Sequence, residues 1–436
     1  MKLSVIGCGY LGAVHAAAMA SLGHDVIGVD VDDRKVLELS SGRAPFYEPG
    51  LQEMLADGLA SGRLAFSTDI EDVGDSTVHF IAVGTPQTRG SNTADLKFVD
   101  SAIAELLPLL SAGDLVVGKS TVPVGTAARL SEYVSQRGAA LAWNPEFLRE
   151  GWAVKDTLEP DRIVVGVPNG EMGERASETL RSVYSAAIEA GVPYLLTNHA
   201  TAELVKVAAN AFLATKISFI NAMAEVAEAT GADVTTLADA LGHDERIGRR
   251  FLGAGIGFGG GCLPKDIRAF MARAEELGLS ESLGFLREVD AINLRRRQRA
   301  VDLVVELLGG TTYGKRVTVL GAAFKPHSDD TRDSPALDVA VRLHGVGAIV
   351  TVTDPEALDN ARSTHPHLNY VKDRDEALHG ADAVVLVTEW DEYRLDMDPV
   401  AAGKLVSGKI IVDGRNCLNP AIWRGAGWTY MGLGRQ

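Results

Sequence analysis

Residues 3–12 read L-S-V-I-G-C-G-Y-L-G, and this stretch decides the fold. The apolar run 3–6 predicts a short buried strand, and the alanine-rich residues that follow predict a helix. Between them stand Gly7, Gly9 and Gly12 at the spacing G-x-G-x-x-G. In such a turn the first glycine permits a tight bend, the second lets a pyrophosphate approach the backbone, and the third lets helix and strand pack closely. The stretch therefore predicts a dinucleotide-binding βαβ unit.

The second strand of this unit indicates which dinucleotide binds. Residues 25–29 predict a strand that ends at Asp30, about 20 residues beyond the glycines. A carboxylate there accepts hydrogen bonds from the adenosine ribose and repels a 2′-phosphate. NAD is therefore favoured over NADP, although the nearby cations Arg34 and Lys35 weaken this inference.

Two threonines follow the next predicted strands. Residues 78–83 and 115–117 predict parallel strands, and Thr85 and Thr121 come after their carboxyl ends. Ligands of open α/β sheets bind at this edge, so both threonines are candidate cofactor contacts. The alternative for each hydroxyl is that it caps the helix that follows.

Composition excludes several classes of protein. The 436 residues suggest two to three domains, and 23% charged and 46% hydrophobic residues are ordinary for a soluble globular protein. The net charge of −16 argues against binding to nucleic acid or a membrane surface, which needs basic stripes. Three dispersed cysteines are too few for a disulfide framework or a metal site, and they suit a reducing, cytoplasmic setting. No uninterrupted apolar run reaches the roughly 18 residues of a membrane-spanning helix.

A second glycine-rich stretch, residues 257–266, reads G-F-G-G-G-C-L-P-K-D. Its glycines let the backbone come close to a ligand. A thiol at the start of a helix, as expected of Cys262 near Lys265, has a lowered pKa and is a candidate nucleophile. The alternative is that Cys262 is a small buried apolar residue.

Residues 200–229 predict one long helix. A helix of this length usually lies between domains or between subunits. Lys206 and Asn210 are four residues apart and share a face with Glu203, so the helix can carry Lys206 into a cleft. The alternative is a surface salt bridge between Glu203 and Lys206.

Two further segments combine charges in different ways. Residues 142–151, A-W-N-P-E-F-L-R-E-G, mix acids, an arginine and aromatic side chains in a predicted loop, which indicates the lining of a site. The basic run 295–299 predicts a solvated helix face.

The strand order of the first domain recurs after residue 311. Four strand-like runs come in the same sequence, at residues 315–320, 348–353, 383–388 and 409–413. Because the glycine turn is degraded to G-A-A-F, this second βαβ domain should not hold a pyrophosphate in the same way. Lys325, Arg332 and Arg415 follow its strands and suit a phosphorylated ligand.

The predicted fold class is α/β, with two Rossmann-like βαβ domains joined by a long central helix and a cleft between them. The predicted domains are a cofactor domain at 1–196, a helical domain with the cysteine loop at 197–300 and a substrate domain at 301–436.

Motifs along nearly the whole chain carry a family resemblance. They are G-C-G-Y-L-G, V-G-T-P, S-T-V-P-V-G-T, N-P-E-F-L-R-E-G, K-V-A-A-N-A-F, R-I-G-R-R-F-L, G-F-G-G-G-C-L-P-K-D, F-K-P and D-G-R-N. The sequence resembles the UDP-glucose 6-dehydrogenase family, within the wider UDP-glucose/GDP-mannose dehydrogenase superfamily. One departure is Gly261, where the family usually has serine before the cysteine.

The resemblance implies two successive NAD-dependent oxidations of one carbon, which convert UDP-glucose to UDP-glucuronate. Cys262 would capture the aldehyde as a thiohemiacetal and then hold a thioester, which splits a difficult step and retains the aldehyde. Lys206 and Asn210 would stabilise the oxyanion, and Asp266 with Glu146 would position and activate water. The remaining residue assigned to catalysis is Thr121.

The resemblance also implies two sets of binding residues. The implied NAD contacts are Gly7, Gly9, Tyr10, Leu11, Gly12, Asp30, Lys35, Thr85, Thr121, Glu150, Lys265 and Arg332. The implied sugar-nucleotide contacts are Glu146, Phe147, Leu148, Arg149, Glu150, Lys206, Asn210, Arg246, Phe251, Gly255, Phe258, Gly259, Lys325 and Arg415. In the family the residue at Arg246 reaches across a dimer built on the long helix, so a homodimer is expected, and higher oligomers are left open.

Two alternatives stand beside this prediction. One is a sister dehydrogenase that acts on GDP-mannose or a UDP-N-acetylhexosamine, although the segment from R-I-G-R-R-F-L to G-F-G-G-G-C is more similar to the UDP-glucose branch. The other is a sugar-nucleotide binder that has lost catalysis, against which the intact Cys262, Lys206, Asn210 and Asp266 argue.

Overall fold

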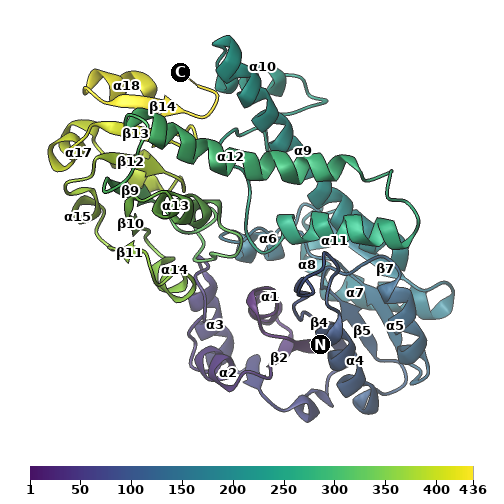
Figure 1. Ribbon diagram of the computed structural model, residues 1–436. Helices are drawn as coiled ribbons and strands as arrows, with labels where there is room; N and C mark the ends of the chain where they lie inside the picture. Colours follow the sequence, from purple (N-terminus) through teal and green to yellow (C-terminus); the bar gives the residue numbers. More distant parts are fainter. Residues whose placement is uncertain (436) are drawn as a thin grey trace. The chain divides into compact units, whose positions relative to one another are not determined.

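A computed structural model describes residues 1–435 of the chain (Figure 1). Contacts divide the chain into two compact units. Unit 1 comprises Met1–Ala209 and Arg268–Gly278, and unit 2 comprises Asn210–Ile267 and Leu279–Gln436. Two helices, α9 (His199–Thr230) and α11 (Leu263–Glu276), contribute residues to both units.

Unit 1 is built on a sheet in the order β3-β2-β1-β4-β5-β6-β7-β8. Its neighbours pair in parallel, except that β6 and β7 meet antiparallel at Trp143 and Gly166. The strands are β1 (Lys2–Ile6), β2 (Asp25–Val29), β3 (Leu64–Ser67), β4 (Val78–Ile81), β5 (Leu115–Gly118), β6 (Ala140–Trp143), β7 (Ile163–Val167) and β8 (Tyr194–Asn198). The central strands β4, β5 and β6 are fully buried, as expected where apolar side chains cover both faces of a parallel sheet.

The helices of unit 1 connect these strands and cover the sheet. They are α1 (Tyr10–Ser21), α2 (Asp33–Ser40), α3 (Leu51–Ala60), α4 (Lys97–Leu106), α5 (Thr126–Ser135), α6 (Ala153–Leu158), α7 (Glu171–Val183) and α8 (Ser185–Glu189). Two short 3₁₀ helices, Ile70–Val73 and Leu107–Leu109, complete the unit. The alanine-rich α1 is buried along most of its length, because its small side chains let it pack closely on the sheet.

Unit 2 contains a second parallel sheet, in the order β11-β10-β9-β12-β13-β14. Its strands are β9 (Arg316–Leu320), β10 (Ile349–Thr353), β11 (Asn369–Tyr370), β12 (Ala383–Leu386), β13 (Ile410–Asp413) and β14 (Thr429–Gly432). The order repeats that of β3, β2, β1, β4, β5 and β6 in unit 1. The predicted α/β class with two Rossmann-like domains and a long central helix is therefore confirmed.

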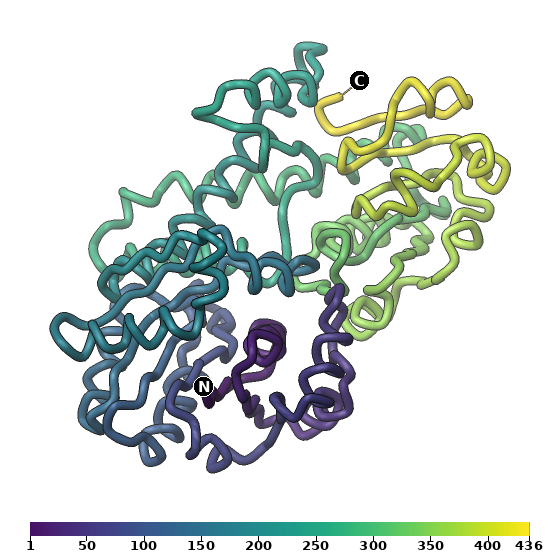
Figure 2. The backbone as a smooth tube through the Cα atoms, turned by 180° about the vertical axis from the view of Figure 1, so that it is seen from behind, coloured from purple at the N-terminus to yellow at the C-terminus, as the bar shows by residue number. Residues whose placement is uncertain are grey.

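Most helices of unit 2 pack around its sheet, and the others form a separate helical part of the unit. They are α10 (Val234–Gly242), α12 (Phe285–Leu307), α13 (Pro335–Gly345), α14 (Leu358–Thr364), α15 (Arg374–Leu378), α16 (Asp391–Arg394), α17 (Pro399–Leu405) and α18 (Pro420–Gly425). Figure 2 follows the backbone of the sheet and its helices in green to yellow. The main core of this unit lies between the sheet, α12 and α13.

Helix α9 is the one described helix that is long and apolar enough to cross a membrane, judged by length and composition alone. Two of its buried polar side chains nevertheless form hydrogen bonds inside the protein. The Ser218 hydroxyl donates to the Val289 carbonyl at 2.7 Å, and the Asn221 carbonyl oxygen accepts from the Gly255 amide at 2.9 Å. Both side chains are fully buried, and such hydrogen-bonded polar groups are typical of a helix in a globular core.

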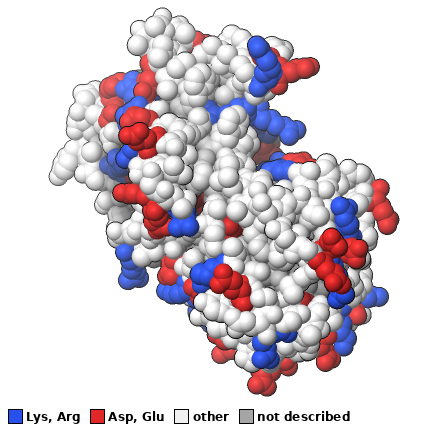
Figure 3. Space-filling view, turned by 90° about the vertical axis from the view of Figure 1, so that its right-hand side faces the viewer, with Lys and Arg blue, Asp and Glu red and all other residues white. Residues whose placement is uncertain are grey.

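Charged side chains of both signs are interspersed on the face of the protein drawn in Figure 3. Nucleic-acid binding requires a continuous basic stripe, and on that face Lys and Arg do not form one.

Candidate active site

The glycine turn between β1 and α1 has the geometry that the sequence predicts. Gly7 has a φ of +91°, and a Cβ on Gly12 would lie 1.8 Å from the Gly7 carbonyl oxygen, so both positions require glycine. A Cβ on Gly9 would meet nothing within 4 Å, which leaves open space beside the first turn of α1. No side chain caps α1 and its first turn has no acid. Its amide groups can therefore hold a pyrophosphate.

Asp30 lies directly after β2 and beside this turn. Its carboxylate accepts from the Cys8 amide at 2.8 Å and pairs with the Lys35 ammonium at 2.8 Å. The Lys35 ammonium is thus engaged by the Asp30 carboxylate. That carboxylate lies next to the open space at Gly9. Cys8 is buried behind the turn, and burial raises the pKa of its thiol.

Thr85 and Thr121 are brought together at the carboxyl ends of β4 and β5. The Thr85 hydroxyl donates to the Thr121 carbonyl at 2.8 Å, and the Ser120 hydroxyl donates to the Val83 carbonyl at 2.7 Å. Neither threonine caps a helix, because α4 begins at Lys97 and α5 has Gly125 at its N-cap. The capping alternative is therefore wrong for both.

The loop after β6 joins the long helix at Lys206. The Lys206 ammonium pairs with Glu146 Oε1 at 2.9 Å and lies 5.7 Å from the centre of the Phe147 ring. The other Glu146 oxygen accepts from the Leu148 amide at 2.7 Å. The Arg162 guanidinium stacks on Phe147 at 3.9 Å. The structure thus brings together Glu146, Phe147 and Lys206, which the sequence assigns to one site.

Arg149 and Glu150 differ in their surroundings. The Arg149 side chain is 57% exposed and pairs with Asp156 at 2.6 Å, whereas Glu150 is buried. Arg149 is therefore engaged by α6, and its contact with a substrate stays a prediction. Leu11 is half-buried at the start of α1.

Glu48 is a buried residue that the sequence reasoning missed. It accepts from the Tyr10 hydroxyl and from the amides of Gly151 and Ala153, at 2.6 and 2.7 Å for the two amides. It thereby joins the start of α1 to the loop before α6, and burial raises the pKa of Tyr10. The sequence signal was weak: an acid between aromatic residues and Pro-Gly in P-F-Y-E-P-G.

Glu203 contradicts the alternative of a surface salt bridge with Lys206. It is 2% exposed and accepts from the amides of Gly125 and Ala127 at 2.7 and 2.6 Å. The amides at the start of α5 are close to this carboxylate, and Lys206 pairs with Glu146 instead.

In unit 2 the second glycine-rich stretch contains Cys262 immediately before α11 and continues into the first turn of that helix. The Cys262 carbonyl accepts from the Asp266 amide at 2.9 Å, so the thiol stands at the N-terminus of the helix. Cys262 is exposed, and the alternative of a small buried apolar residue is wrong for it. That description fits Cys8, and burial also raises the pKa of Cys417.

Asp266 is fixed one turn into α11. Its side chain is 2% exposed, and its two oxygens are engaged separately. Asn210 donates to Oδ2 at 2.6 Å, and the Lys265 ammonium pairs with Oδ1. The structure thus joins three predicted residues, with Lys265 held against Asp266.

Polar side chains from α12 hold the glycine-rich stretch in place. Asn293 accepts from the Phe258 amide at 2.7 Å and donates to the Phe258 carbonyl at 2.9 Å, and Arg297 donates to the same carbonyl at 3.0 Å. The prediction of a solvated face at 295–299 is therefore partly wrong, because Arg296 and Arg297 are 1% and 3% exposed. Arg296 pairs with Glu228 on α9 at 2.6 Å. Burial is possible because acids from other elements pair with these guanidinium groups.

The Arg332 side chain lies against Gly261. A Cβ on Gly261 would lie 2.3 Å from Arg332 Cζ, so the guanidinium occupies the space that a side chain would need. Arg332 also pairs with Asp330 at 2.7 Å, and its carbonyl accepts from the Gly260 amide at 3.0 Å. This chain therefore places a cation against the residue before Cys262.

The other predicted substrate contacts in unit 2 fall into three groups. Arg415 donates to the carbonyls of Val387, Gly257 and Phe324 at 2.7, 2.8 and 3.1 Å, and Lys325 lies 5.3 Å from the Phe324 ring centre. Cβ atoms on Gly255 and Gly259 would lie 2.4 Å from the Gly414 oxygen and 2.2 Å from the Asp333 oxygen, so these glycines permit close backbone approach. Arg246 and Phe251 lie on the surface, where Arg246 pairs with Asp244 at 2.6 Å.

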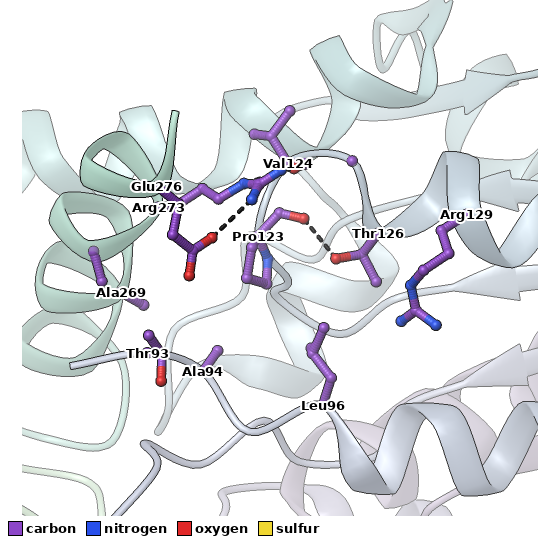
Figure 4. A pocket seen from close by; sticks show the side chains of 12 residues that line it. Thr93, Ala94, Leu96, Pro123, Val124, Thr126, Arg129, Ala269, Arg273 and Glu276 are labelled. Atoms are coloured by element: carbon purple, nitrogen blue, oxygen red, sulfur yellow. Dashed lines mark hydrogen bonds and ion pairs between the residues drawn. The ribbon is translucent and has the colours of Figure 1, made fainter. Parts of the chain in front are cut away.

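A pocket of about 290 Å³ in unit 1 lies beside the loop that carries Thr121 (Figure 4). None of the residues predicted for cofactor, substrate or catalysis lines it. Its lining comes from the loop before α4, the start of α5 and the outer part of α11. In Figure 4 the Arg273 side chain extends from α11 toward Val124 and pairs with Glu276.

Family models match this chain along most of its length. The NAD-binding domain of the UDP-glucose/GDP-mannose dehydrogenase family matches residues 1–188, its central domain matches 200–295, and its UDP-binding domain matches 318–420. The chain belongs to the UDP-glucose/GDP-mannose dehydrogenase family. The NAD-domain match contains β1 to β7 of the first sheet, and the UDP-domain match contains most of the second sheet but not β14.

Relatives of this dehydrogenase cover its full length. A UDP-glucose 6-dehydrogenase of Rhizobium meliloti is 42% identical, with 100% of both chains covered. The solved UDP-glucose dehydrogenase of Pyrobaculum islandicum is 40% identical with a TM-score of 0.90, covering 100% of this chain and 98% of that one. A UDP-D-ManNAc dehydrogenase from Pyrococcus horikoshii is 28% identical with a TM-score of 0.86, covering 100% and 99%. The fold is thus shared across branches, whereas sequence identity is higher on the UDP-glucose side.

The residues of this dehydrogenase fit NAD on structural grounds. The open space at Gly9, the uncapped start of α1 and the Asp30 carboxylate are complementary to a pyrophosphate and a ribose diol. Among residues 1–435, no group of three or more His, Cys, Asp or Glu side chains is arranged to hold a metal ion.

Proposed function

We propose that this enzyme oxidises UDP-glucose to UDP-glucuronate in two successive NAD-dependent steps, with Cys262 as the covalent nucleophile. The observation that carries the proposal is the exposed thiol at the N-terminus of α11, whose first turn also contains Lys265 paired with the buried Asp266. A helix N-terminus and neighbouring cations favour the thiolate. A chain that only binds sugar nucleotides needs none of these groups.

The residues of the chain account for the chemistry as follows. The glycine turn and Asp30 would hold NAD, which would supply the hydride acceptor for each oxidation. The Cys262 thiolate attacks the aldehyde carbon made by the first oxidation and forms a C–S bond, which gives a thiohemiacetal. The second oxidation converts this to a thioester, and water then breaks the C–S bond to release the carboxylate and the thiolate.

Polar residues support these steps. We assign the ammonium of Lys206 and the amide of Asn210, one helical turn apart on α9, to the oxygen on which negative charge develops. We assign Asp266 and Glu146 to the positioning and deprotonation of water. The fixed geometry of both carboxylates, each hydrogen-bonded through both oxygens, supports this assignment.

The test is to supply UDP-glucose and NAD and to measure NADH formed per sugar consumed. A ratio of two supports the proposal, because each sugar passes through both oxidations before release. The same assay with GDP-mannose and with UDP-N-acetylhexosamines identifies the branch of the family. A ratio of one would refute the thioester route, and the absence of NADH with every sugar nucleotide would favour a non-catalytic binder.

We also propose that the enzyme is a cytoplasmic homodimer assembled through α9. Phe212, Phe219 and Val226 are spaced seven residues apart on this helix and are 67%, 49% and 54% exposed. Apolar side chains at this spacing form one stripe, which a second helix can cover. Light scattering should give the mass of two chains, and Phe219→Glu should give the mass of one. A single-chain mass for the wild type would refute the dimer.

A further inference from the structure

The loop that carries Thr121 connects β5 to α5, and at its end the Thr126 hydroxyl donates to the Pro123 carbonyl at 2.7 Å. Gly125 occupies the N-cap of α5 with a φ of +103° and has no side chain to cap the helix. The first amides of a helix otherwise lack partners. In this protein the carboxylate of Glu203 replaces the missing cap, with both oxygens accepting from the amides of Gly125 and Ala127.

The capping carboxylate comes from a distant part of the sequence. Glu203 lies on α9, three residues before Lys206, so the two side chains leave neighbouring turns of the same face. One carboxylate thus connects the loop of Thr121 to the part of α9 that bears Lys206. The side chain is 2% exposed, so solvent does not compete for these hydrogen bonds.

A second side chain holds the loop from α11. Arg273 Nε donates to the Val124 carbonyl at 3.0 Å, and the arginine extends over this loop in Figure 4. Burial raises the pKa of Glu203, while the amides of Ala127 and Gly125 and the Arg273 charge act in the opposite direction. Both oxygens accept hydrogen bonds from backbone amides, which favours the carboxylate form.

We propose that Glu203 is a positioning residue that fixes the Thr121 loop relative to Lys206, so that cofactor-binding and catalytic side chains keep one geometry. The inference rests on the proposed roles of Thr121 and Lys206. A helix cap that served stability alone would change the melting temperature and would leave kinetics unchanged. A positioning residue would instead change cofactor use, since small displacements of a reacting group slow catalysis strongly.

The experiment compares Glu203→Gln with a matched control. The glutamine keeps the shape but turns an NH₂ group toward a backbone amide, which loses one hydrogen bond. The control is Asp114→Asn at the opposite end of β5, where a carboxylate that is 8% exposed accepts from the Ser111 amide at 2.7 Å. We expect both variants to melt at lower temperature. Glu203→Gln should also lose about tenfold in kcat/KM for NAD, whereas Asp114→Asn should keep the wild-type value.

A double-mutant cycle with Thr121→Ala tests whether Glu203 affects kcat/KM for NAD through the Thr121 loop. If Glu203 acts through the loop, its substitution costs less when Thr121 is already absent, so the two losses do not multiply. Fully multiplicative losses, or unchanged kinetics in Glu203→Gln, would overturn the inference. If Glu203→Gln does not fold, Glu203→Asp is used instead, because it keeps the charge on a shorter side chain. Wild-type NAD affinity in Glu203→Asp would likewise overturn the inference.

The same series separates this inference from the function on which it depends. Wild-type activity in both Thr121→Ala and Lys206→Ala would refute the site assignment itself. Loss of activity in those two variants together with unchanged kinetics in Glu203→Gln would refute the positioning role alone.

Discussion

At the scale of single residues, the role of Cys262 is the most direct to test. Cys262→Ser keeps the size of the side chain but replaces the thiolate with a much weaker nucleophile. We expect steady-state turnover of UDP-glucose to fall by at least about a hundredfold, because the aldehyde is no longer captured. The measurement is NADH production under saturating substrate and cofactor. Turnover equal to that of the wild type would refute the assignment of the nucleophile.

Lys119 allows a prediction about alkaline pH. Its ammonium is buried against Asn144 at 3.0 Å, and burial lowers its pKa to about 8. In the unfolded chain the amine keeps its proton up to about pH 10.4. Between these values the unfolded state binds more protons, so the free energy of unfolding contributed by Lys119 rises with pH.

Lys119→Met tests this pH dependence. The substitution preserves volume, and Tyr184 still donates to Asn144 at 2.7 Å. The difference in unfolding free energy between wild type and variant, measured in urea at pH 7.5 and 9.5, should shift in favour of the wild type at the higher pH. A difference that does not change with pH would contradict the lowered pKa.

Residue identities could be predicted from sequence where the signal is local. Gly7, Gly12 and Cys262 stand in short motifs whose spacing dictates the turn or the helix start. Glu48 and Glu203 could not be predicted, because their partners lie about a hundred and about eighty residues away in the chain. A single acidic residue outside any motif has no sequence spacing that predicts its role. Its role depends on which backbone amides the tertiary fold brings close to its carboxylate.

At the scale of elements, helix α12 supports the glycine-rich stretch through Asn293. This fully buried amide pairs with both backbone groups of Phe258. Asn293→Ala leaves the Phe258 amide without a partner, at a cost of about 1–3 kcal/mol, and leaves the Phe258 carbonyl with Arg297 as its donor. We expect kcat to fall about tenfold or more and the melting temperature to decrease, with the KM for NAD unchanged because the NAD-binding residues of unit 1 are untouched.

The control for this helix is Asn419→Ala, which removes the cap of α18 without contacting the stretch. It should lower stability and leave kcat as in the wild type. Equal kcat in Asn293→Ala and in the wild type would show that the stretch does not need this support.

The elements themselves were predictable to different degrees. The strand-turn-helix at the start and its repeat after residue 311 follow from apolar runs and turn glycines, and both sheets confirm the predicted order. The extension through β7 and β8 was not predicted, because no ligand-binding motif marks these strands. The buried face of α12 was misjudged, since a run of arginines looks solvated until the acids that pair with it are known.

At the scale of the whole molecule, the distribution of buried histidines predicts that the two units differ in their stability in acid. Unit 1 contains four whose pKa is lowered chiefly by burial, His15, His24, His79 and His199, and for His79 the pKa is about 4. Among the described residues of unit 2 this holds for His365 alone. A lowered pKa means that the unfolded state binds the proton first, so stability falls as the pH drops below about 6.5.

Unit 1 should therefore open before unit 2 in mild acid. Hydrogen exchange at pH 7.0 and 5.5, corrected for the intrinsic rates, should show a greater loss of protection in β1 and β4 than in β9 and β12. Burial raises the pKa of three carboxyls in unit 2, Asp413, Glu356 and Glu392, and of one in unit 1, Glu203, and protonation of such carboxyls favours the fold. Equal loss of protection in the two sheets would contradict this division.

The contrast among the three cysteines has a practical consequence. Cys8 and Cys417 are held as protonated thiols by burial, whereas Cys262 is exposed at a helix N-terminus. A thiol-directed alkylating reagent at neutral pH should therefore mark each folded chain once, and the mark should coincide with inactivation. Alkylation of Cys262 would thus serve as an active-site titration of the unmodified protein. The mass of bound label would give the number of active molecules in a preparation, with no engineered tag required.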